Sequence, residues 1–171
     1  MAPWEEFFLA CNFKPDTPQL VIDWLTYLTP PFDDESVTKP SEVPDHHFFD
    51  SDSWDWEQIF MDDTYYFPGK SVAHFGKDEF AGRYTLTARA MVRAGDYAVA
   101  ALLHWIAQYS QTEGFVGYTR CDEIHDVINH IHFYKGEAYY HQIDLGEDPP
   151  QVKKIKLTKE KGPYGPELSD I

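Results

Sequence analysis

The fold is constrained most strongly by a strand–helix pattern that the chain contains twice. Residues 6–13 are rich in aromatic and apolar side chains, and residues 84–92 alternate between apolar and polar ones, so both are predicted strands. Apolar side chains at helical spacing then predict one amphipathic helix over 17–28 and another over 97–109. We interpret this repetition as a duplicated strand–helix unit.

The first helix also carries boundary signals. Asp16 is a suitable N-cap residue, and Pro18 falls in the first turn, where its missing N–H costs nothing. Gln19 completes the spacing of a capping box. Pro30 and Pro31 then end the helix, because proline cannot continue it.

Further strands are predicted after the second helix. Residues 114–121 form one of them. Residues 127–134 and 137–143 flank Lys135-Gly136, which has the composition of a two-residue hairpin turn. Residues 151–158 alternate apolar side chains with lysines, a pattern typical of an edge strand.

Together these elements predict an α+β fold, with an antiparallel or mixed sheet and two main helices on one face, ferredoxin-like in spirit. A chain of 171 residues is most simply one domain, here over 1–158, followed by a flexible tail over 159–171 that is rich in glycine and proline. The second face of the sheet would be exposed to solvent, covered by an insert over residues 30–80, or buried in a homodimer.

Residues 30–80 are predicted to form an acidic insert in this domain. Between Asp33 and Asp63 the chain has eleven acidic residues and one lysine. A disordered linker would be poor in aromatic residues, yet the insert contains Phe48, Phe49, Trp54, Trp56, Phe60, Tyr65, Tyr66 and Phe67. We therefore expect a short helix near 53–61 that packs on the domain, with 65–67 extended.

The charge distribution restricts the class of partner. The net charge is −15, and residues 1–150 alone carry −17. Such a field repels phosphate backbones and anionic lipid surfaces, so we expect neither a nucleic acid nor a membrane as partner. A basic protein, a metal ion or a basic small-molecule ligand fits this charge better, although acidity can also serve solubility alone.

The two cysteines and the N-terminus predict a cytoplasmic location. Cys11 and Cys121 fall within predicted strands and form no disulfide framework, so both are expected to be reduced and buried. The first residues include Glu5 and Glu6 where a secretory signal would have basic residues. No apolar run approaches the roughly 18 residues of a spanning helix.

The clearest candidate for a functional site in the sequence is a cluster of histidines on the predicted hairpin. With Lys135-Gly136 as the turn, strand alternation brings His130, His132 and His141 to one face, and Glu137 joins them. Three imidazoles and a carboxylate would suit Zn²⁺ or another first-row metal. Histidines also occur on half-exposed strands without a ligand, and a shift of one residue in register would separate these three.

Other catalytic patterns are weak or missing. Asp45-His46-His47 is a second histidine motif, but adjacent histidines do not readily face one metal ion. The aspartates from Asp50 onward lack the glycine of a calcium-binding EF-hand loop. The sequence contains no nucleophile elbow, phosphate-binding loop or dinucleotide fingerprint, which disfavours an enzyme of those classes.

Several motifs resemble a family of small bacterial proteins to which no function is assigned. The likeness covers about half of the chain and carries over no activity or site residue. Its motifs are Asp16-Thr17-Pro18 with the Val-Ile-x-Trp-Leu helix, His47-Phe48-Phe49, Trp54, Tyr65-Tyr66-Phe67, and the later helix that ends near Trp105.

Two functions follow as hypotheses. The first is a non-enzymatic binding or regulatory protein, in which Trp54, Trp56, Tyr65 and Tyr66 contact a basic protein or a small-molecule ligand without any cofactor. The alternative is a metal-dependent hydrolase that uses the hairpin histidines as ligands of a metal such as zinc, which would activate water.

Overall fold

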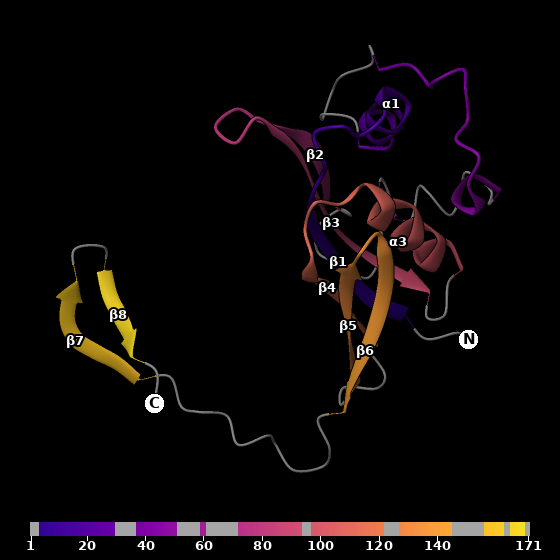
Figure 1. The fold of residues 1–171 in the computed structure, drawn as a ribbon. Coiled ribbons are helices and arrows are strands. Elements are labelled where there is room, and N and C mark those ends of the chain that lie inside the picture. Colours follow the sequence, from indigo (N-terminus) through magenta and orange to yellow (C-terminus); the bar gives the residue numbers. More distant parts are fainter. Residues whose placement is uncertain are drawn as a thin grey trace.

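The computed structural model describes residues 4–29, 37–50, 59–60, 72–93, 97–121, 127–144, 156–162 and 165–169. Among these residues it has an antiparallel sheet of six strands with two long α-helices (Figure 1). The predicted α+β class is therefore confirmed. A duplication of the strand–helix unit stays a prediction.

All neighbouring strands in the six-stranded sheet are antiparallel, in the order β2-β3-β1-β4-β5-β6. The strands are β1 (Trp4–Asn12), β2 (Val72–Asp78), β3 (Arg83–Arg93), β4 (Gly114–Cys121), β5 (Val127–Tyr134) and β6 (Glu137–Asp144). The helices are α1 (Gln19–Leu28), the short 3₁₀ helix η1 (His47–Asp50) and α3 (Tyr97–Tyr109).

One face of the sheet forms the core with both helices. Along β1, Phe7, Leu9 and Cys11 are buried, whereas Phe8 and Asn12 alternate with them and lie on the other face of the strand. A fully buried side chain of this size contributes roughly 1.5–3 kcal/mol. The largest fully buried side chains are Trp24, Trp105, Phe7, Phe13, Phe48, Phe133, Leu9, Leu25, Leu28, Ile59, Leu86 and Leu102.

Helix α1 begins later than the capping signals predicted. Pro18 is its N-cap residue, and no side chain caps the helix, so the prediction for Asp16 is wrong. The Thr17 hydroxyl instead donates to the Lys14 carbonyl at 2.7 Å, closing a turn before the helix. Gln19 donates to Asp23 at 2.7 Å rather than reaching back to the cap. The cause is Pro18, whose extended ψ of 141° delays the first helical turn.

Part of the acidic segment packs on the domain through aromatic side chains. Phe49 lies between the two helices, with its ring centroid 4.8 Å from that of Trp24 and 4.9 Å from that of Trp105. Phe48 stacks on Trp105 with an interplanar angle of 11°. The Trp24 indole N–H donates to the Glu42 carbonyl at 2.7 Å. These contacts fix η1 against α3.

Two regions differ from the sequence expectations. β2 lies within residues 30–80 but pairs with β3 along its whole length, a strand that the sequence analysis did not predict. β7 (Lys156–Gly162) and β8 (Gly165–Ser169) form a separate two-stranded sheet where the sequence predicted an edge strand over 151–158. The single domain over 1–158 and the flexible tail over 159–171 stay predictions. Of the helix expected near 53–61, only Ile59 and Phe60 are described, and both are helical.

No helix among the described residues is long and apolar enough to cross a membrane.

Candidate functional site at the edge of the sheet

Helix α3 leaves one narrow stripe exposed. Ala100, His104 and Gln108 are exposed at a spacing of four residues. The other described side chains of α3 are buried except for the half-buried Tyr109. The stripe runs along the helix beside β6, the last strand of the sheet. Sites for small ligands are typically concave and lined mostly by apolar side chains.

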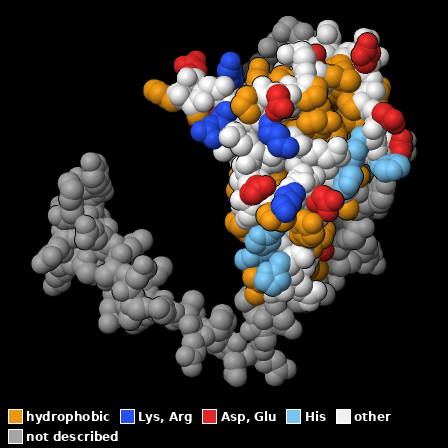
Figure 2. Space-filling view, viewed as in Figure 1, with side chains coloured by type: hydrophobic (Ala, Val, Ile, Leu, Met, Phe, Trp, Pro, Cys, Tyr) orange, Lys and Arg blue, Asp and Glu red, His pale blue; other side chains and the backbone are white. Residues whose placement is uncertain are grey.

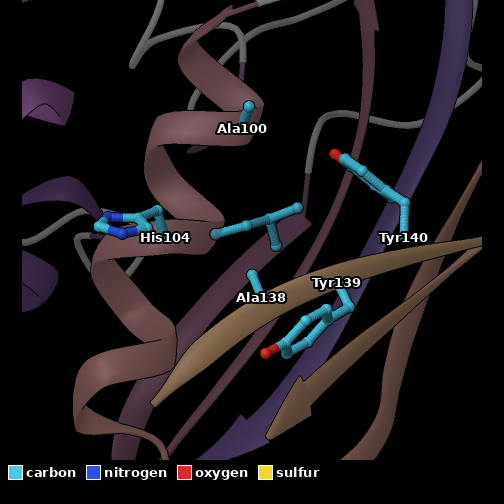
Figure 3. Close-up of a pocket in the computed structure, with 6 residues that line it drawn as sticks. Ala100, His104, Ala138, Tyr139 and Tyr140 are labelled. Atoms are coloured by element: carbon cyan, nitrogen blue, oxygen red, sulfur yellow. The ribbon is translucent and has the colours of Figure 1, made fainter.

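A pocket of about 210 Å³ opens in this groove (Figure 3). Its surface is mostly apolar because alanines, a leucine and tyrosine rings provide most of the lining. Tyr139 and Tyr140 leave β6 in opposite directions, as successive strand residues do. The lining residues are Ala100, Leu103 and His104 from α3 and Ala138, Tyr139 and Tyr140 from β6.

A pair of histidines borders the pocket on the side of α3. His46, next to η1, lies with its Nε2 2.9 Å from Nδ1 of His104, and the two rings stack with centroids 5.2 Å apart. Burial lowers the pKa of His46, and the neighbouring His104 and His47 lower it further, against an opposing effect of Asp50. His47 contacts the Asp50 carboxylate at 3.0 Å.

On the other side of β6, the hairpin histidines lie in the predicted register. His130 is opposite His141 and His132 is opposite Tyr139, so this part of the sequence interpretation is confirmed. The ring centroids of His132 are 6.2 Å from those of both His130 and His141. Figure 2 shows histidine side chains gathered in two patches on the face in view.

These histidines surround an exposed aromatic side chain. Phe115 of β4 lies with its ring centroid 4.9 Å from that of His130 and 5.9 Å from that of His132. Within the described residues, no group of three or more His, Cys, Asp or Glu side chains is placed to hold a metal ion. A shared metal would require the imidazoles to turn toward a common point, and the metal site stays a prediction.

An ion cluster that the sequence did not suggest lies on the same face of the sheet. The Glu6 side chain is buried, accepts a hydrogen bond from Arg89 at 2.9 Å and forms an ion pair with Arg120 at 3.1 Å. Burial and the Glu6 carboxylate raise the pKa of Tyr118, whose ring stacks with Phe8. Strand alternation could have placed Glu6 on this face, but only the strand order brings both arginines beside it.

Cys11 and Cys121 are both free and buried in this fold, which agrees with their predicted state. Burial raises the pKa of the Cys11 thiol to about 12, despite a hydrogen bond with Ser110 that acts in the opposite direction. Because the thiolate is the reactive form, this raised pKa disfavours reaction at Cys11.

The predicted binding residues Trp54, Trp56, Tyr65 and Tyr66 lie outside the described residues. The pocket residues carry no shared sequence signal, because they are common residue types on two elements that only the fold brings together. His104 was the one available signal, as a polar residue in a strongly apolar helix.

The sequence matches no protein-family model, and no curated protein or solved structure matches it significantly. The fold and site define an acidic α+β protein with an apolar pocket at one edge of its sheet.

Proposed function

We propose that this protein is a non-enzymatic binding or regulatory protein that recognises a basic protein or a basic small-molecule ligand. The observation that carries the proposal is the charge of −17 on residues 1–150. A strongly acidic surface attracts cationic partners over long range and accelerates their association. The pocket between α3 and β6 supports this function by offering an apolar contact within an acidic protein.

The proposal is tested by selecting ligands from a random peptide display library on the immobilised protein. Selected peptides are expected to carry excess lysine and arginine. Their affinity should fall steeply as the salt concentration rises. At about 0.1 M ionic strength, salt already screens the attraction between exposed charges that lie more than about 10 Å apart. A neutral protein of similar size serves as the control surface. Selected peptides without a positive charge bias, or with affinity that salt leaves unchanged, would contradict the proposal.

A second candidate function rests on the register of the hairpin. His130, His132 and His141 share one face of β5 and β6, with Glu137 on the same face, as ligands and base of a metal-dependent hydrolase would require. This function predicts about one first-row metal ion per chain in protein purified without a histidine tag. Elemental mass spectrometry of the protein and of its His130→Ala variant tests it, and metal-free wild-type protein would rule it out.

We further propose a cytoplasmic location, supported by the two free buried thiols. A homodimer through the sheet face that bears Phe8 and Phe115 is proposed as well, since Phe115 is 52% exposed. Sedimentation velocity of the full chain tests the dimer. A monomer across the accessible concentration range would remove it.

A further inference from the structure

Within the part of the chain that the structure describes, no strand pairs with the outer edge of β6. Among the described strands, β6 pairs with β5 alone. The turn residues Lys135 and Gly136 have φ of 52° and 81°, which fits a type I′ two-residue hairpin. In such a hairpin Tyr134 and Glu137 exchange both backbone hydrogen bonds, and pairs along the strands then alternate.

This alternation determines which backbone groups of β6 face outward. Glu137, Tyr139 and His141 use their N–H and C=O groups toward β5. Ala138, Tyr140 and Gln142 therefore direct theirs to the outer edge. Ala138 and Tyr140 also line the pocket, so the outward-facing backbone groups and the apolar pocket belong to the same two residues.

The size of the pocket indicates what enters it. Its volume of about 210 Å³ lies below the roughly 300–1,000 Å³ of typical small-molecule sites. A single aliphatic side chain fits better. A strand added antiparallel to β6 would place the side chains opposite Ala138 and Tyr140 on the α3 side, toward this pocket (Figure 3).

The opposite face of β6 favours basic side chains on such a strand. Glu137 is exposed, and its carboxylate accepts from the Tyr139 hydroxyl at 3.1 Å. Residues of an added strand that alternate with the aliphatic ones would project on this side. Lysine or arginine there would contact the Glu137 carboxylate and the exposed Tyr139 ring.

A second copy of the chain fits this edge less well. Each copy carries a net charge of −15, so two copies repel each other as they approach. The charge of the chain therefore favours a basic segment over self-pairing.

We propose that the α3–β6 edge binds an extended basic segment of a partner protein by antiparallel strand addition, with an aliphatic side chain in the pocket and lysine or arginine toward Glu137. This inference rests on the proposed function and specifies its binding site. Main-chain hydrogen bonds to Ala138, Tyr140 and Gln142 would provide affinity, and the pocket would select the side chain.

The experiment measures binding of a fluorescent peptide of alternating lysine and leucine to the full chain by anisotropy. Ala100→Leu fills the pocket from an exposed position on α3, and we expect it to weaken binding at least about tenfold. Gln108→Leu is the matched control, because it adds the same side chain to the same exposed stripe outside the pocket. We expect its affinity to equal that of the wild type.

Backbone methylation of the peptide tests the strand geometry. In the proposed arrangement the leucine N–H groups face β6, so N-methylation at the leucines should abolish binding. N-methylation at the lysines, whose N–H groups face away, should leave it intact. Equal effects of the two peptides, or equal affinity of the Ala100→Leu and Gln108→Leu variants, would overturn this site.

The two proposals fail in different ways. Basic peptides selected from the display library that bind Ala100→Leu as tightly as the wild type would overturn the site while leaving the basic partner in place. A library that yields no basic peptides would overturn the proposed function itself.

Discussion

The Nε2 atom of His46 lies 2.9 Å from the Nδ1 atom of His104. The backbone N–H of Phe48 donates to the other ring nitrogen of His46 at 3.1 Å. Nδ1 of His46 therefore carries no proton, and neutral His46 donates from Nε2 to His104. This chain of hydrogen bonds requires both rings to be neutral, and it joins η1 to the helix that lines the pocket.

Acid should weaken this connection. Burial, His104 and His47 lower the pKa of His46 from its ordinary value of 6.5. The folded state then binds fewer protons than the unfolded state, so the stabilisation is complete above pH 6.5 and is lost as the pH falls below it. We expect the free energy of unfolding, measured with urea, to decrease between neutral pH and about pH 5.

The His46→Asn variant isolates this effect. An asparagine oxygen can still accept from the Phe48 N–H, as at other helix N-caps, but the side chain does not titrate. The variant should lose less stability on acidification than the wild type. An exposed hairpin residue that does not titrate serves as the control, and Gln142→Asn should keep the pH dependence of the wild type. Identical losses in wild type and His46→Asn would refute the role of this pair.

The elements that the sequence predicted are those with strong local signals. Alternation places Phe7, Leu9 and Cys11 on the inner face of β1, and Lys135-Gly136 sets the hairpin register. β2 has only a weak alternation, and pairing with β3 decides its structure. Its turn signal was nevertheless present, because the Asp78 carboxylate accepts from the N–H groups of Phe80 and Ala81.

Truncation of Phe48 should be strongly destabilising. The ring is 0% exposed and stacks on Trp105 with centroids 5.4 Å apart. Loss of a buried phenylalanine ring costs about 3–5 kcal/mol. Phe80 provides a matched control, because it is 104% exposed and Phe80→Ala should change stability by no more than about 0.5 kcal/mol. Urea unfolding of both variants measures the difference, and similar values for the two would show that η1 is not part of the core.

Gly117 allows β1 and β4 to approach closely. A Cβ atom at this position would collide with the backbone carbonyl of Phe8, which cannot move aside as a side chain can. Gly117→Ala should therefore destabilise the protein by about 1–3 kcal/mol. At Gly76 an added Cβ meets only the flexible His74 ring, at 3.2 Å. We expect thermal unfolding to show a clear loss for Gly117→Ala and little change for Gly76→Ala, and equal midpoints would contradict the close approach.

The candidate site was predicted only in part, for physical reasons. The hairpin histidines follow from strand period and turn composition, which are local. The pocket depends on Ala100 of α3 lying beside Ala138 and Tyr140 of β6, and no local pattern links these residues. The strand order decides that contact.

The ion cluster around the Glu6 carboxylate also depends on the strand order. Glu6 is 7% exposed, and it joins Arg89 of β3 to Arg120 of β4 across the central strand. Glu6→Gln would remove the negative charge and leave two guanidinium groups close together around a buried amide. The arginine side chains are about half exposed, so solvent limits the loss, which we expect to be about 1–3 kcal/mol.

Salt distinguishes this charge effect from a general defect in packing. Added salt screens the repulsion between the half-exposed arginines, so the Glu6→Gln variant should recover part of its stability at high ionic strength. Glu79→Gln, at an exposed turn position, is the matched control and should remain near the wild type at every salt concentration. Urea unfolding of the three proteins across a salt series provides the measurement. If Glu6→Gln matched Glu79→Gln throughout, Glu6 would have no part in holding β3 and β4 to β1.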